Sequence, residues 1–190
     1  MAPDAVTVIK RDHRVIEALF DRLRDPSSDR AALVEEVAAR FAAHARAEED
    51  HVYPALAKAD PSDADELHHG VDEHHEAEEL LEELRDTEPD SPDFQTALQE
   101  LVDAVRHHVE EEEAEILPQL AESVDRTRLV ELGRAFEDAR LRELREAGFD
   151  ADGGAGDVAE MTHDEVLDMT QEAEIPGRSQ HRRDELVQGR

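Results

Sequence analysis

The chain of 190 residues contains no cysteine, a single tyrosine and only 3% aromatic residues. Without cysteine it cannot form disulfides, thiolate metal sites, iron–sulfur clusters or a cysteine nucleophile. No hydrophobic run approaches the length of a membrane span, and the N-terminus MAPDAVTVIKRDHR lacks the apolar centre of a signal peptide. We therefore expect a cytoplasmic protein that has no membrane partner.

Basic residues are also scarce. The chain has 21 lysines and arginines against 51 acidic residues, which gives a formal net charge of -30. A surface with this balance repels nucleic acid and concentrates cations, so we do not expect a nucleic-acid partner. Adaptation to high salt is an alternative explanation of the charge.

Two segments of the chain repeat one another. HARAEEDHVYP, which starts at His44, and HVEEEEAEILP, which starts at His108, both read His, three residues, Glu-Glu and a later Pro. Upstream, DHRVIEALFDRLRD from Asp12 aligns with EHHEAEELLEELRD from Glu73. Residues four apart lie on one face of a helix, so each His-x3-Glu can present an imidazole and a carboxylate to one point. The repeat thus offers six ligands, enough for two metal ions: His13, His44, Glu48, His74, His108 and Glu112.

The apolar rhythm around these residues predicts that they face inward. His13, for example, continues a seam of Ile9, Ile16 and Phe20 at helical spacing. A carboxylate at such a depth is costly unless it is paired or coordinated, so the six side chains would destabilise the core without a cation.

Helix signals predict an all-α protein, an up-down-up-down four-helix bundle with an added fifth helix and a small helical C-terminal appendage. The expected helices span about residues 4–24, 29–58, 62–85, 92–122 and 125–147, with Pro54 kinking or fraying the end of the second. The fifth has an apolar stripe that packs either on the bundle or on a second subunit, as a homodimer: Leu129, Leu132, Phe136 and Leu144.

The composition changes after the fifth helix. We divide the chain into a bundle (1–147), a Gly/Asp-rich linker (148–158) and an appendage (159–190). The appendage resembles the helix-extended-helix modules found at the N-terminus of the transcription terminator Rho, because the DEL and IPGRS elements recur. Such modules often bind nucleic acid, and the only compact basic cluster is here: Arg178, His181, Arg182 and Arg183. Its own acids oppose phosphate binding, which favours a docking or stabilising role.

The order of ligands in the bundle is similar to that of the hemerythrin-like family, the HHE cation-binding domains, over about residues 6–120. The resemblance implies a non-haem di-iron centre in which Glu48 and Glu112 bridge the ions. It assigns His13 and His44 to one iron and His74 and His108 to the other. From the residue types alone, manganese or zinc would suit the site as well. A ferritin-like bundle is the competing interpretation, but it needs Glu-x-x-His on two alternate helices; Glu48 with His51 fits once, and the fourth helix has none.

The chain departs from oxygen-carrying hemerythrins, which have a second His four residues after the first on the third helix. Glu78 occupies that position here, and Glu112 follows His108 by four residues, where the carriers have five. A more anionic or less His-rich site favours ferric iron and irreversible oxidation. Glu78 is thus a candidate additional ligand or a neighbour of the ligands. Tyr53 is either a packing residue or a proton or electron donor that reaches the metal pocket.

Other polar residues fall off the inward positions of the repeat. We interpret the remaining histidines of the bundle as surface residues: His51, His68, His69, His75 and His107. Three glutamates belong by the same pattern to a solvated acidic face: Glu49, Glu111 and Glu113.

Two classes of function remain. One is an enzyme that decomposes hydrogen peroxide, as a catalase does, or reduces another small oxidant in oxidative stress. The other is a binding protein that stores iron or senses iron, oxygen or nitric oxide without turnover.

Overall fold

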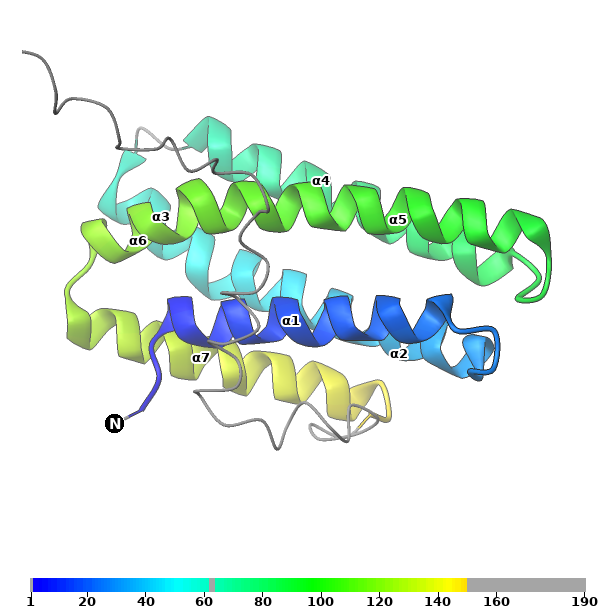
Figure 1. The fold of residues 1–190 in the computed structure, drawn as a ribbon. Coiled ribbons are helices and arrows are strands. Elements are labelled where there is room, and N and C mark those ends of the chain that lie inside the picture. Colours follow the sequence, from blue (N-terminus) through cyan, green and yellow to red (C-terminus); the bar gives the residue numbers. More distant parts are fainter. Residues whose placement is uncertain (1, 62–63, 150–190) are drawn as a thin grey trace, which may run out of the picture. The chain divides into compact units, whose positions relative to one another are not determined.

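The computed structural model describes residues 2–61 and 64–149, and every regular element in these residues is a helix (Figure 1). The predicted all-α class is therefore confirmed. The elements are α1 (Ala5–Arg24), α2 (Arg30–Ala47), the π-helix η1 (Glu48–Val52), α3 (Tyr53–Ala59), α4 (Ala64–Asp86), α5 (Pro92–Glu111), the π-helix η3 (Glu112–Ile116), α6 (Leu117–Ser123) and α7 (Arg126–Glu146). The predicted appendage, and all but the first two residues of the predicted linker, lie outside the described residues.

The long helices begin and end at local signals in the sequence. The side chain of Asp4 accepts a hydrogen bond from the backbone N–H of Thr7 at 3.0 Å, which caps α1. Ser91 caps α5 in the same way, and Pro92 follows at the first helical position. After α7, Gly148 has a φ of 84°, a left-handed conformation that costs glycine little.

The two repeat prolines each follow a turn of π-helix. The backbone N–H of Tyr53 bonds to the carbonyl of Glu48, and that of Leu117 bonds to the carbonyl of Glu112. Proline lacks an N–H and its ring crowds the carbonyl four residues earlier, and a wider turn relieves both effects. The expected fraying at Pro54 is thus wrong, because the helix continues as α3. The π-turns begin at the two glutamates that the repeat singled out, and such turns often mark functional sites.

The apolar core consists of two clusters with a polar layer between them. One cluster includes Ile16 of α1 and Phe41 of α2, and the other includes Ile9 of α1 and Ala47 of α2. His13 lies between Ile9 and Ile16 along α1, and is itself buried. Helices α1, α2 and α4 therefore pass through apolar packing on both sides of the polar layer, which holds that layer away from solvent.

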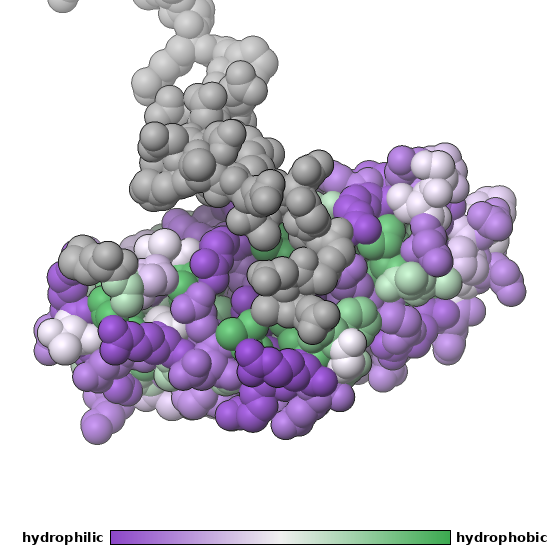
Figure 2. All heavy atoms as spheres, turned by 90° about the horizontal axis from the view of Figure 1, so that it is seen from below, coloured by the Kyte–Doolittle hydropathy of each residue, from purple (hydrophilic) through white to green (hydrophobic). Residues whose placement is uncertain are grey.

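Helix α7 packs against α1 and α2, with Leu132 and Phe136 buried in the second cluster. The approach is close at Gly133, where an added Cβ would lie 2.7 Å from the carbonyl carbon of Asp4. The apolar stripe of the fifth helix is thus covered within the chain. Within the described residues, no helix is long and apolar enough to cross a membrane. The face shown in Figure 2 is mostly hydrophilic, in keeping with the acidic composition.

Candidate metal centre

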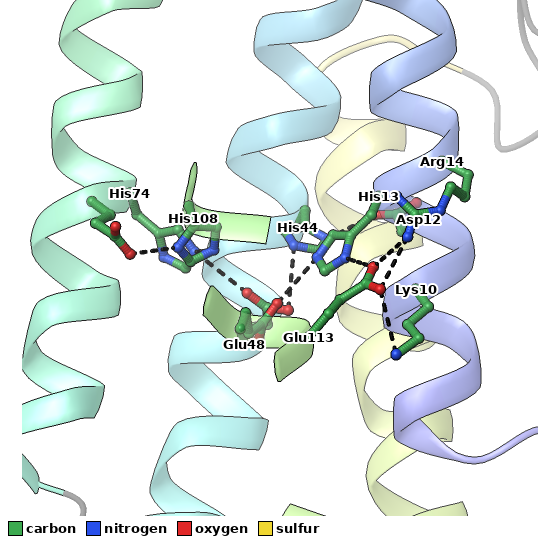
Figure 3. A network of polar contacts seen from close by, with 11 residues as sticks. Lys10, Asp12, His13, Arg14, His44, Glu48, His74, His108 and Glu113 are labelled. Carbon is green, nitrogen blue, oxygen red and sulfur yellow. Dashed lines mark hydrogen bonds and ion pairs between the residues drawn. The ribbon is translucent and has the colours of Figure 1, made fainter. Parts of the chain in front are cut away.

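The structure brings together the six residues that the repeat predicts, in the polar layer between the two apolar clusters (Figure 3). They come from both helix pairs, and each is between 0% and 3% exposed: His13, His44, Glu48, His74, His108 and Glu112. Full burial of two carboxylates with four imidazoles is rare without a compensating charge.

The donor atoms form two groups that share Glu48. In the first, His13 Nε2 lies 3.1 Å from Glu112 Oε2, and His44 Nε2 lies 3.3 Å from Glu48 Oε1. In the second, His74 Nε2 lies 3.4 Å from Glu48 Oε2 and 3.1 Å from His108 Nε2. Within each group one donor atom per residue lies within 4.8 Å of all the others. Glu48 thus offers one oxygen to each group, as a bridging carboxylate does.

The hydrogen-bonding state of these atoms tests whether a cation fits. Within the described part of the chain, the inner atoms lack hydrogen-bond partners: Nε2 of His13 and His44, and both carboxylate oxygens of Glu48 and Glu112. Buried polar atoms without partners are expensive, and six of them aimed at one place require an explanation. Metal ions would satisfy all of them, and imidazole with carboxylate suits iron, manganese or zinc.

The outer nitrogen of each imidazole contacts a second set of carboxylates. His44 Nδ1 lies 3.0 Å from Asp12, and His108 Nδ1 lies 2.9 Å from Glu73. The other two imidazoles also have Nδ1 contacts of 2.9 Å, from His13 to Glu113 and from His74 to Glu49. A carboxylate on one ring nitrogen fixes the tautomer and orientation that direct the other nitrogen to a metal.

These four carboxylates correct the expectation that Glu49 and Glu113 belong to a solvated face. Glu113 is only 16% exposed, and it contacts Lys10 and Arg14 as well as His13. A signal for this role was present in the sequence, because Asp12 and Glu73 occupy equivalent positions in the repeat, as do Glu49 and Glu113. A residue beside an inward position can reach the neighbouring helix, and helix-face periodicity does not reveal such a contact.

Helix α7 supports one of the two halves. Arg140 is buried, and its Nη1 lies 3.0 Å from Asp12 Oδ1, so Asp12 joins the guanidinium of α7 to the imidazole of α2. Phe136 meets His44 edge to face with the ring centres 5.5 Å apart. Because α7 follows the repeat, no pattern in the repeat could have indicated this support.

The electrostatics of the first group are those of a site that needs a cation. Burial lowers the pKa of His13, but the carboxylates of Glu112 and Glu113 outweigh it and raise the pKa to about 10. Burial lowers the pKa of His44 to about 4 against the effect of Asp12. Burial, together with the charge of Glu112, raises the pKa of Glu48. Burial also acts to raise the pKa of Glu112, but His13 overcomes it and lowers the value to about 2. Without metal, the group at neutral pH thus keeps a proton on His13, and the raised pKa of Glu48 favours its protonated form.

Tyr53 and Glu78 lie in different surroundings. The ring of Tyr53 stacks on His74 with the centres 5.8 Å apart, and its buried hydroxyl has no hydrogen-bond partner within the described part of the chain. Burial and the charges of Glu48 and Glu112 raise the pKa of this hydroxyl. Glu78 is half-buried and lines a hollow on the surface beside Ala42 and Arg85. In the described residues, none of the three groups with metal-ligand spacing includes Glu78.

The remaining histidines of the bundle lie away from the centre. Four are exposed, as expected: His68, His69, His75 and His107. His51, in the π-turn after Glu48, is half-buried.

The fold and this geometry define the class: a helical protein with buried groups of histidines and carboxylates that could hold metal cations. The sequence matches the hemerythrin HHE cation binding domain over residues 4–120, more than half of its length. The chain belongs to this family, and is thus a metal-cation-binding protein of hemerythrin-like fold.

Two relatives extend the comparison. A solved structure of a hemerythrin HHE cation binding domain-containing protein from Mycobacterium kansasii matches 84% of this chain and 99% of its own, at 27% identity and a TM-score of 0.64. A DNA nickase from Nostoc sp. is 28% identical over 150 residues, which are 77% of this chain. The match covers 42% of the length of the nickase.

Proposed function

We propose that the chain holds two iron ions in an up-down-up-down four-helix bundle, with one ion in each donor group and Glu48 bridging them. His13 and His44 would bind the first ion, and His74 and His108 the second. Glu112 belongs to the first group and would serve as a second bridging carboxylate once both ions are bound. The sharing of Glu48 carries this proposal, because its two oxygens point to two separate sets of imidazoles.

We infer further that the centre acts on a small oxidant, with the decomposition of hydrogen peroxide to oxygen and water as the reaction. Iron bound there would supply the change of oxidation state that this chemistry needs. The chain contributes the rest. Four carboxylates hold the imidazoles in place: Asp12, Glu49, Glu73 and Glu113. The apolar clusters keep bulk water out. The ring of Tyr53 stacks on His74, and we assign the proton donor of this reaction to its buried hydroxyl.

The position of Glu78 supports oxidation that does not reverse. Glu78 stands where the oxygen carriers have their second histidine, and it lines the surface hollow. His74 is therefore the only imidazole that α4 contributes to the two groups. A centre with fewer imidazoles than the oxygen carriers have stabilises ferric iron and leaves room for an exogenous ligand. Reversible oxygen binding is therefore not the function that we propose.

Metal analysis followed by peroxide addition tests the proposal. The iron-loaded protein should contain about two ions per chain and release oxygen from hydrogen peroxide over many turnovers. Exposure of the reduced protein to air should give an oxidised spectrum that deoxygenation does not restore. Iron content near zero after loading would refute the centre. A restored spectrum would indicate an oxygen carrier and refute the redox assignment.

Sensing of iron, oxygen or nitric oxide is the second candidate, and the contact of α7 with the centre favours it. A change at His44 can reach α7 through Asp12 and Arg140, at contacts of 3.0 Å each. Sensing requires an element with two arrangements that the site biases. A stable, stoichiometric spectral change on peroxide or gas addition, without turnover, would support this function over the enzyme.

We propose no nucleic-acid substrate of the kind that the name of the Nostoc relative implies. The net charge of -30 opposes the approach of any nucleic-acid phosphate backbone. We propose a small oxidant or a diatomic gas as the partner.

A further inference from the structure

A second arrangement of imidazoles and carboxylates lies on the surface of α4 and α5, outside the buried centre. His69 and Glu73 are four residues apart on α4, and His107 and Glu111 are four residues apart on α5. Each pair is thus another His-x3-Glu, with both side chains on one helix face. The two helices pack against each other and bring the pairs together.

We propose that His69, Glu73, His107 and Glu111 form a surface binding site for a divalent first-row transition ion, separate from the two ions of the buried centre. The proposal goes beyond the redox function, and it does not depend on what the buried centre holds.

The distances fit direct coordination. His69 Nε2 lies 3.6 Å from both Glu73 Oε1 and Glu111 Oε2. His107 Nε2 lies 3.3 Å from Glu111 Oε1 and 3.8 Å from Glu73 Oε1. Nitrogen and oxygen ligands about 2.0–2.1 Å from a tetrahedral ion lie about 3.3–3.4 Å from each other. The donor atoms of His69, Glu73 and Glu111 already lie within 4.8 Å of one another, and a rotation of the exposed His107 side chain brings its imidazole to them.

Glu73 is the fixed member of this surface site. Its Oε2 contacts His108 Nδ1 at 2.9 Å, so the carboxylate is held and its Oε1 points toward the surface. The side chain of Glu73 is 11% exposed, whereas His69 and His107 are 57% and 62% exposed. A preorganised carboxylate with two accessible imidazoles lowers the cost of binding an ion from solvent.

The surrounding charge favours a cation. Glu66 lies close enough to Glu115 and Glu111 that their interaction and negative charge raise its pKa. Two imidazoles with two carboxylates suit zinc, cobalt and ferrous iron better than the calcium or magnesium that a purely acidic surface attracts.

Titration of zinc into the iron-loaded protein, followed by calorimetry, tests the site. The wild-type chain should bind one further zinc ion. A His69→Ala/His107→Ala double variant should lose that binding by at least tenfold in affinity, with the iron content unchanged. A His68→Ala/His75→Ala double variant is the matched control, because it also removes two exposed histidines, and it should bind as the wild type does.

Cobalt as a second probe reports the geometry, since a tetrahedral site gives intense visible absorption. That absorption should appear in the wild type and the control and be absent in the His69/His107 variant. Absence of a further ion in the wild type, or equal binding by the two double variants, would overturn the proposal. Because both double variants keep the buried centre intact, a difference in zinc binding between them reports on the surface site alone. A failure of the buried centre to hold iron would affect both variants equally.

Discussion

The carboxylate of Asp12 contacts His44 of the next helix, with Oδ2 3.0 Å from Nδ1, although Asp12 directly precedes His13 in the chain. Glu73 repeats this relationship, because it precedes His74 and contacts His108. Each helix pair is thus tied by a carboxylate from its first helix to the imidazole of its second. The same contact sets the ring nitrogen that faces the centre.

Removal of these outer carboxylates should weaken metal binding without removing a ligand. We expect Glu49→Ala to lower iron affinity roughly 10- to 100-fold, because His74 loses the partner that orients it. Asp12→Ala should do the same and also lower the melting temperature of the metal-free protein, since buried Arg140 then lacks its carboxylate. Competition with a chelator and thermal unfolding measure the two effects. Equal melting temperatures for both variants would contradict the role of Arg140.

Substitution of the shared carboxylate should cost the most metal. Glu48→Gln is expected to lose iron from both groups, because each depends on one of its oxygens. Glu110→Gln, on the exposed side of α5, is the matched control. Glu78→Gln should also retain two ions, since Glu78 lines the surface hollow. Iron content by elemental analysis decides each case, and loss in the Glu78 variant would make Glu78 a ligand.

Metal binding should release protons near neutral pH. Coordination needs a neutral imidazole and an ionised carboxylate, whereas the pKa of His13 is raised to about 10 and that of Glu48 is also raised. Because bound metal displaces these protons, iron affinity should rise with pH between about 6 and 8. Calorimetry in buffers of different ionisation enthalpy counts the protons. A pH-independent affinity with no proton release would contradict the charge states inferred for the metal-free site.

The hydroxyl of Tyr53 should matter for chemistry and not for folding. It has no hydrogen-bond partner in the described part of the chain, so Tyr53→Phe leaves no buried group unpaired and should change the melting temperature little. We expect unchanged iron content and slower oxygen release from peroxide. Wild-type turnover in this variant would reduce Tyr53 to a packing residue against His74.

The contact of α7 with α1 allows no side chain at position 133. Gly133→Ala places a Cβ 2.7 Å from the backbone of Asp4, and backbone cannot move aside as a flexible side chain can. The free energy of unfolding should fall by about 1–3 kcal/mol, as for other overpacked positions. Chemical denaturation measures this change, and an unaltered midpoint would mean that α7 lies farther from α1.

The sequence was sufficient to predict the helices and the cluster of six residues, because both follow from periodic spacing. His44 and Glu48 lie four apart among apolar neighbours, and a duplicated pattern makes chance agreement improbable. The outer carboxylates were missed because contacts between helices depend on packing angles. The π-turns could not be foreseen either, since a proline in a helix can produce a kink, a break or a wide turn.

The duplicated halves of the bundle are no longer equivalent, because α7 supports only one of them. Asp12 is held by buried Arg140, whereas the corresponding Glu73 faces two exposed histidines. The two ligand sets, although they repeat one sequence pattern, therefore differ in how they exchange metal ions with solvent. Exchange of an ion is expected to be fast at His74 and His108 and slow at His13 and His44. A chelator should then remove iron from the centre in two kinetic phases of equal amplitude.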